Sequence, residues 1–169
     1  MAHRSVLVAF FSHSGNTQSI ANQIHEIVGG NAFRILAAHH YPSDYGAVVE
    51  VARKELQNGD RPALADQVTN MGSYDVVFLG YPNWWSTMPM AVFSFLEAHD
   101  FSGKKIAPFC THEGSSLGRS VEDIRALCPR SIVLDGLAVR GGSAGTAKED
   151  VHAWLERIGL ARKADSPSR

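Results

Sequence analysis

The sequence predicts an α/β fold built around a parallel sheet with helices on both faces. Short apolar runs alternate with amphipathic stretches along the whole chain, which is the pattern of repeated strand and helix units. The first apolar run, residues 5–11, is continuous rather than alternating, as expected for a strand that helices cover on both sides. With 169 residues, the chain is long enough for one domain with a substantial core. We therefore expect one α/β domain over residues 1–160 and a polar tail over residues 161–169.

The first two strand and helix units occupy the N-terminal third of the chain. Residues 5–11 form the first expected strand, and residues 20–28 carry apolar side chains at helical spacing before two glycines end the helix. Residues 32–38 form the second strand, and residues 48–56 have the spacing of a second helix. The following stretch, residues 57–74, shows little periodicity, so we expect an irregular connection there.

The third unit is the most apolar part of the chain. Residues 74–81 predict a central strand that ends at Pro82. We expect Thr87 to cap the next helix, with Pro89 in its first turn, because proline is favoured there and the apolar residues 92–96 follow at helical spacing.

The C-terminal part of the chain supplies two further units. Residues 105–111 predict the fourth strand, and residues 121–127 predict a helix after a turn rich in glycine and serine. Residues 131–139 predict one continuous fifth strand. Residues 146–149, Thr-Ala-Lys-Glu, have the pattern of a capping box ahead of a last helix that reaches Ile158.

Composition excludes several functional classes. A net charge of −1 argues against nucleic-acid binding, since phosphate backbones are bound by basic surfaces. No apolar run is long enough to span a membrane or to act as a signal peptide, so we expect a cytoplasmic protein. Cys110 and Cys128 lack metal-binding or redox spacing, and the histidines lack metal-ligand spacing. We therefore expect no metal, no membrane and no nucleic-acid partner.

The position of a ligand follows from the fold class. In an open parallel sheet, ligands bind beyond the carboxyl ends of the strands, where the strand order reverses. The loops after the first, third and fourth strands lie at that edge, and each has an unusual composition.

The segment after the first strand is rich in hydroxyl groups and leads directly into a helix. It reads Ser12-His13-Ser14-Gly15-Asn16-Thr17. Free amides at the helix start, the positive end of the helix dipole and the hydroxyls of Ser12, Ser14 and Thr17 suit a phosphate group. The segment has no lysine, so one terminal phosphate fits it better than a triphosphate. The alternative is a polar cap that only begins the helix.

Two adjacent tryptophans follow the third strand, in the segment Pro82-Asn83-Trp84-Trp85-Ser86. Indole faces stack well on flat aromatic rings, so this segment predicts the site of a ring system. The alternative is that both tryptophans pack into the core or form a protein interface. Because adjacent side chains of an extended segment point in opposite directions, we expect one of the two to fold back.

The segment after the fourth strand, Thr111-His112-Glu113-Gly114, offers a hydroxyl group and free amides at the next strand end. These groups suit the polar edge of a flat heterocycle. His112 and Glu113 are residue types that transfer protons, but adjacent side chains rarely converge on one atom, so we interpret them as a solvated pair and expect no catalytic residue.

The three segments resemble the flavin loops of the flavodoxin family, over residues 5–159 of this chain. Residues 12–17 resemble the family motif Thr/Ser-x-Thr/Ser-Gly-x-Thr, which binds phosphate, and residues 80–89 resemble the second flavin loop of short members with a Trp-Trp pair. Residues 110–115 resemble the third loop. The resemblance implies a flavodoxin-like three-layer sandwich, with a five-stranded sheet in the order 2-1-3-4-5. It also implies FMN, with Trp84 or Trp85 on the isoalloxazine ring and the Thr111 to Gly114 segment at its pyrimidine edge.

Two features depart from the family pattern. Flavodoxins that carry electrons are typically strongly acidic, whereas this chain is nearly neutral. The second loop also lacks the glycine that many members have there. In those members a peptide flip in this loop bonds N5 of the reduced flavin. Here a flip would strain a residue other than glycine unless Asn83, which tolerates left-handed conformations better, absorbs it, so we expect weak stabilisation of the semiquinone.

Electron transfer through FMN is the favoured function, with a redox partner protein or an NAD(P)H-dependent reductase and with a monomer or weak homodimer as the state of assembly. In this function the dimethylbenzene edge of the flavin is exposed to the partner. The alternative is an NAD(P)H-dependent FMN oxidoreductase of the quinone reductase type, which needs an open flavin face. A remote alternative is a serine hydrolase using Ser116 of a Gly-x-Ser-x-Gly pattern, with Asp135 and His152. A flavin-free binding module is a further possibility.

Overall fold

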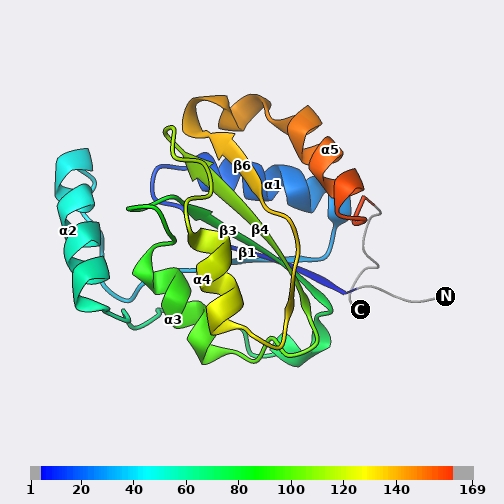
Figure 1. Ribbon diagram of the computed structural model, residues 1–169, viewed down its shortest axis with the longest axis horizontal. Coiled ribbons are helices and arrows are strands. Elements are labelled where there is room, and N and C mark those ends of the chain that lie inside the picture. The colour runs from blue at the N-terminus through cyan, green and yellow to red at the C-terminus, as the bar shows by residue number, and fades with distance from the viewer. Residues whose placement is uncertain (1–4, 162–169) are drawn as a thin grey trace.

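Strand β1 (Val6–Phe10) lies in the interior of the sheet, and all five of its apolar side chains are buried. In the computed structural model, which describes residues 5–161, β1 pairs in parallel with β2 (Asn31–Arg34) and with β3 (Val76–Pro82). β3 pairs in parallel with β4 (Lys105–His112), and a fifth strand lies beyond β4. The order β2-β1-β3-β4-β5 confirms the predicted parallel sheet (Figure 1).

The fifth strand is interrupted, which corrects the prediction of one strand over residues 131–139. β5 (Ile132–Val133) and β6 (Leu137–Arg140) both pair with β4, and between them Leu134 donates its N–H to Ile106 of β4 at 2.9 Å. The ladder stops there because the next residue of β4 in line to donate to this strand is Pro108, which has no N–H. Beyond this point the carbonyl of Asp135 accepts the indole N–H of Trp154 at 2.8 Å.

Two pairs of helices cover the sheet, one pair on each face (Figure 1). α1 (Asn16–Val28) and α5 (Lys148–Arg157) share one apolar core with the even-numbered residues of β1, such as Val8. α3 (Met90–Ala98) and α4 (Ser120–Leu127) share the other core with the odd-numbered residues, such as Ala9. This arrangement confirms the predicted sandwich and follows from the two-residue alternation of side chains along a strand.

Two predicted helix starts are wrong. α3 begins after Pro89, and the hydroxyl of Thr87 donates to Asp123 of α4 instead of capping α3. Thr146 lies in the 3-10 helix η2 (Gly141–Thr146), where its hydroxyl donates to the carbonyl of Ser143 at 3.4 Å, so the predicted capping box does not form. In both cases a nearby tertiary or local partner takes the hydroxyl. A second 3-10 helix, η1 (Met71–Ser73), precedes β3.

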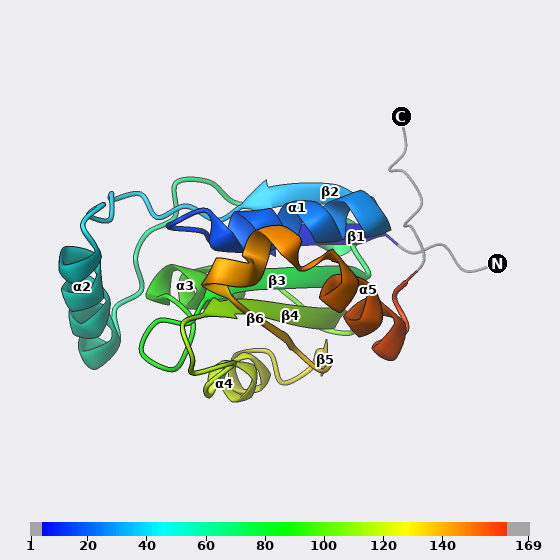
Figure 2. The ribbon, with the colours of Figure 1, turned by 90° about the horizontal axis from the view of Figure 1, so that it is seen from above.

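Helix α2 (Tyr45–Asn58) lies apart from the four helices that cover the sheet (Figures 1 and 2). Asp44 caps its N-terminus by accepting the N–H of Ala47 at 2.9 Å, and Gly59 ends it with φ of 65°. Both are residues that suit those positions. The helix therefore forms where the sequence predicts it, but beyond the carboxyl edge of the sheet.

A short neck carries α2 away from the sheet. Residues 35–38, predicted to belong to the second strand, leave the sheet after Arg34. Ala38 instead donates its N–H to the carbonyl of Ala63 at 2.7 Å, and Ala65 donates to Leu36 at 2.8 Å. The antiparallel pairing of residues 36–38 with residues 63–65 joins the two connections of α2, and we call it the neck. The predicted tail, residues 161–169, lies outside the described residues except for residue 161.

Candidate functional site

The loops after β1, β3 and β4 lie side by side at the carboxyl edge of the sheet, as expected. The register explains why, because Phe10 of β1 is opposite Gly80 of β3, and Pro82 at the end of β3 is opposite Thr111 of β4. Neighbouring strands thus end at the same level, and the three loops leave the sheet together.

A cavity of about 750 Å³ lies between these loops and α2. Its volume falls within the range of sites for one small-molecule ligand, roughly 300–1,000 Å³. Most of the residues predicted to bind a cofactor line it, namely His13, Ser14, Asn16, Pro82, Asn83, Trp84, Trp85, Ser86, Thr111, His112 and Glu113. The predicted residues Ser12, Gly15, Thr17 and Gly114 lie outside its lining. No lysine or arginine is present among the described residues that line the cavity.

Ser12 stabilises the first loop through hydrogen bonds to its backbone. Its buried Oγ accepts the N–H groups of Gly15 and Gln18, both at 3.2 Å, and so caps the first turn of α1. Gly15 has a φ of 98°, a conformation that favours glycine. The alternative that the sequence left open, a polar cap that begins the helix, is therefore realised by Ser12, while Ser14 and Asn16 face the cavity.

Arg34 brings a positive charge to the first loop, which has no cation of its own. It lies at the end of β2, and its guanidinium donates to the carbonyl of Ser12 at 3.2 Å and to the side chain of Gln18 at 3.4 Å. Because Arg34 lies outside the loop in the sequence, no local pattern indicates this contact. The first turn of α1 contains no acidic residue, so the local charge favours an anion.

Thr17 and Thr111 join the first loop to the third. Their hydroxyl oxygens lie 2.7 Å apart, and the two residues are only 2% and 5% exposed. Each hydroxyl is the buried partner of the other, so the two loops are fixed relative to one another.

The second loop makes a strained two-residue turn. Trp84 and Thr87 exchange backbone hydrogen bonds, and the residues between them have positive φ, 57° for Trp85 and 71° for Ser86. Asn83 donates its backbone N–H to Thr111 at 2.8 Å and continues the ladder between β3 and β4, so the left-handed residues of this loop are Trp85 and Ser86. The expected weak stabilisation of the semiquinone stays a prediction.

Further hydrogen bonds hold the second loop against the start of α4. The Asn83 side chain donates to the carbonyl of Ser116 at 2.8 Å and accepts the N–H of Ser86 at 2.9 Å. The carbonyl of Ser86 accepts the N–H of Arg119 at 2.7 Å. Gly118 permits this approach, since a Cβ there would lie 2.3 Å from the Ser86 carbonyl oxygen. The loop that carries the tryptophans is therefore rigidly supported.

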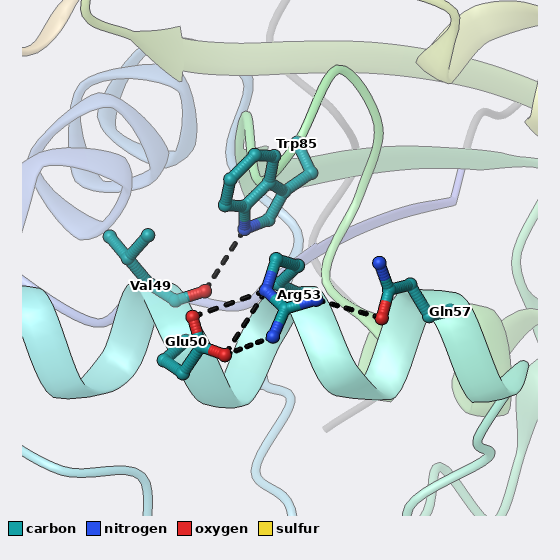
Figure 3. Close-up of polar contacts among 5 residues, drawn as sticks. All are labelled: Val49, Glu50, Arg53, Gln57 and Trp85. Atoms are coloured by element: carbon teal, nitrogen blue, oxygen red, sulfur yellow. Dashed lines mark hydrogen bonds and ion pairs between the residues drawn. The ribbon is translucent and has the colours of Figure 1, made fainter.

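The two tryptophans have different surroundings, which confirms that one of them folds back. Trp84 packs edge-on against Phe11 and Tyr41, with ring centroids 5.3 and 5.2 Å apart, and joins the apolar core under α3. Trp85 is 45% exposed, and its indole N–H donates to the carbonyl of Val49 in α2 at 3.0 Å (Figure 3). Both rings nevertheless line the cavity.

The third loop holds His112 as a neutral ring. Its Nδ1 accepts the N–H of Gly114 at 2.9 Å, which leaves the proton on Nε2. Burial lowers the pKa of His112, the charge of Arg140 lowers it further, and the charge of Glu113 opposes both effects. Arg140 donates to the carbonyl of Glu113 at 3.3 Å. In this arrangement Nδ1 is occupied as an acceptor and Nε2–H is the donor of the ring.

One wall of the cavity was not predicted. Tyr45, Val48, Val49 and Ala52 of α2 line it together with the loops. The apolar spacing of α2 indicates that one face is buried, but it does not indicate what that face lies against. The only available signal is the long irregular connection after the helix, which is longer than a compact strand and helix unit needs.

The two cysteine thiols and the metal-ligating side chain types give no sign of a further reactive site. Burial raises the pKa of the Cys110 thiol to about 12 and that of the Cys128 thiol to about 11, so both stay protonated. Within residues 5–161, no group of three or more histidine, cysteine or acidic side chains is placed to hold a metal ion. In the same part of the chain, no helix is long and apolar enough to cross a membrane.

The chain is similar to a known protein family. The family model of the flavodoxins matches residues 5–158, which contain all three loops and α2. No curated protein sequence matches the chain.

Several solved structures are similar to this one. A candidate flavoprotein from Bacteroides eggerthii is 33% identical with a TM-score of 0.82, and the match covers 92% of this chain and 98% of that one. A flavoprotein from Lactobacillus acidophilus in complex with FMN is 17% identical with a TM-score of 0.72, over 92% of this chain and 99% of that one. A candidate quinone reductase from Klebsiella pneumoniae is 16% identical with a TM-score of 0.55, over 95% and 86%. The last two similarities show the fold alone.

Proposed function

The chain belongs to the flavodoxin family, and we propose that it binds one FMN in the cavity at the carboxyl edge of the sheet and functions as an electron-transfer protein. The observation that carries the proposal is the composition of the cavity lining, in which a hydroxyl-rich helix start, two tryptophans and a polar loop surround one space. A cavity of this composition suits a ligand with one phosphate, one flat ring and a polar ring edge.

The first loop binds the phosphate in this proposal. His13, Ser14 and Asn16 line the cavity at the start of α1 and bind a single phosphate group there, with the dipole of α1 behind them. The lining holds no lysine or arginine for further phosphates, which favours FMN over a dinucleotide or a triphosphate. Ser12 and Thr17 act indirectly, because they hold the loop in shape.

The second and third loops bind the flavin ring in this proposal. The tryptophan rings supply apolar faces, and Trp84 is the more rigid of the two because three aromatic rings surround it. Thr111, His112 and Glu113 lie at the polar edge, where the Nε2–H of the neutral His112 is a free donor. These groups fix the orientation of the ring without transferring protons.

Bound FMN supplies the capacity to take up and release electrons, and the protein supplies the binding site and the electrostatic environment. No acid or base is required from the chain for electron transfer. We infer a protein partner or an NAD(P)H-dependent reductase as the source of electrons.

An NAD(P)H-dependent oxidoreductase on the same fold is the second candidate. The net charge of −1 favours it, because a nearly neutral protein does not steer basic partner proteins as an acidic carrier does. The hydrolase alternative has less support. Among residues 5–161, no hydrogen bond joins the side chains of Ser116, Asp135 and His152, and His152 is exposed on α5.

The first experiment is the absorption spectrum of the purified protein, followed by denaturation and identification of the released flavin. We expect a yellow protein that releases about one FMN per chain. A colourless protein that also fails to bind added FMN would instead support the flavin-free module. Anaerobic mixing with NADPH then separates the two redox functions. A carrier is reduced rapidly only when a flavodoxin reductase is added, whereas an oxidoreductase is bleached by NADPH alone.

A further inference from the structure

The face of α2 toward the cavity is buried without belonging to either core. Val48 and Ala52 are 5% and 6% exposed, yet both apolar cores of the sandwich exclude them. Together with Val49 they occupy positions three and four residues apart, which form one stripe along a helix. Val48, Val49 and Ala52 also line the cavity, so this face of α2 forms part of its wall.

Two contacts hold this face of α2 over the tryptophan loop. The indole N–H of Trp85 donates to the backbone carbonyl of Val49 at 3.0 Å, beside the ion pair of Glu50 and Arg53 on the same helix (Figure 3). The buried carboxylate of Glu55 accepts the hydroxyl of Tyr41 at 2.7 Å, and the ring of Tyr41 packs against Trp84. The position of α2 is therefore tied to both tryptophans.

The loops and α2 contribute different side chains to the cavity lining. The loops supply polar groups such as Ser14, Asn16 and Glu113, whereas three of the four lining residues of α2, Val48, Val49 and Ala52, are aliphatic and the fourth is Tyr45. FMN has the same asymmetry, since it carries a phosphate and a polar pyrimidine edge but an apolar dimethylbenzene edge. A cavity of about 750 Å³ is the size of a site for one such ligand.

We propose that α2 is a wall of the FMN site and that Val48, Val49 and Ala52 bind the apolar dimethylbenzene half of the flavin ring. This inference rests on the proposed binding of FMN and adds residues to the site that the three loops do not contain. It also changes how a redox partner reaches the flavin. The ring edge that a carrier exposes is covered by α2, so a protein partner contacts α2 before it contacts the flavin.

The test compares two alanines of the same helix. Ala52 faces the cavity, whereas Ala47 is exposed and outside the lining. Ala52→Phe places an aromatic ring in the cavity beside α2, and Ala47→Phe adds the same ring at an exposed position. Flavin-free protein is titrated with FMN and with lumiflavin, which has the ring but no phosphate, and binding is followed by quenching of flavin fluorescence.

We expect Ala52→Phe to weaken the binding of both ligands by a similar factor of roughly tenfold or more, because the contacts that are lost are made to the ring, which both ligands have. Ala47→Phe should bind both ligands like the wild type. Binding of FMN by Ala52→Phe with wild-type affinity would overturn the inference and leave the proposed function standing. Failure of the wild type itself to bind FMN would overturn the proposed function.

A milder pair keeps the test valid if Ala52→Phe displaces α2, which circular dichroism and thermal unfolding of the flavin-free protein would reveal. Val49→Thr retains the shape of the side chain and the backbone carbonyl that Trp85 binds, but it places a hydroxyl against the ring. Val51→Thr makes the same change on the same helix outside the cavity lining. We expect a loss of lumiflavin affinity of about threefold or more for Val49→Thr and none for Val51→Thr. Equal affinities for this pair would contradict the inference.

Discussion

The hydrogen bond between Thr17 and Thr111 should be measurable as a coupling between two residues that are distant in sequence. Both hydroxyls are buried, and within the described chain each has the other as its hydrogen-bond partner, at 2.7 Å. Replacing one threonine by valine leaves the other hydroxyl buried without a partner, which costs about 1–3 kcal/mol of unfolding free energy. Replacing both removes the unsatisfied group and leaves two methyl groups in contact. We therefore predict that the double variant is more stable than the sum of the two single losses implies, by about 1 kcal/mol or more.

The measurement is a double-mutant cycle on flavin-free protein. Urea unfolding of the wild type, Thr17→Val, Thr111→Val and the double variant gives the four free energies, and the absence of flavin removes any contribution from ligand binding. Losses that simply add would refute the reasoning, because they would mean that the hydroxyls are bound to water rather than to each other. Additive losses would also remove the argument that the first and third loops are fixed together before FMN binds.

Three further predictions follow from the same site. Ser14→Ala should weaken FMN binding by roughly tenfold and leave the binding of riboflavin, which has no phosphate, unchanged, since the hydroxyl faces the proposed phosphate site. Equal losses of affinity for both flavins would show that Ser14 does not bind the phosphate. Ser86→Gly should raise the unfolding free energy by about 0.5–1 kcal/mol, because glycine removes the strain of a φ of 71°; urea unfolding that shows a loss would contradict the assigned turn. His112 has a pKa below its ordinary value of 6.5, so the folded protein binds fewer protons than the unfolded one, and stability should fall as the pH drops below that value. His112→Asn should lose this part of the pH dependence in urea unfolding between pH 8 and pH 5, and identical profiles for variant and wild type would argue against it.

Much of the fold could be predicted because its signals are local. The continuous apolar run of β1 and the helical spacing after it are properties of neighbouring residues, and the parallel sheet follows from their repetition. The three loops could be identified for a related reason, since the rule for parallel sheets converts positions in the sequence into one place in space. Ser14 and Trp85, which are distant in sequence, indeed line the same cavity.

Two of the incorrect predictions concern groups whose local preference is decided by a residue far away in the sequence. Thr87 has the residue type of a helix cap, but Asp123 of α4 takes its hydroxyl. The fifth strand is broken because Pro108 of β4 has no N–H to donate to it. A local pattern ranks what a residue prefers, and a tertiary partner of comparable energy can reverse that preference.

The sequence by itself determined the parallel α/β fold and the edge of the sheet at which the three loops meet, and it predicts a single phosphate at the first loop. Each of these follows from the types and spacing of nearby residues. Only the tertiary structure decided whether the apolar face of α2 packs into the core of the sandwich or forms the wall of a cavity. The apolar spacing of Val48 and Ala52 indicates that both side chains are removed from water. The hydrophobic effect has no direction, however, so this spacing cannot distinguish the core of the sandwich from the wall of a cavity. The neck decides between them, because the pairing of residues 36–38 with residues 63–65 carries the helix past the sheet and over the tryptophans.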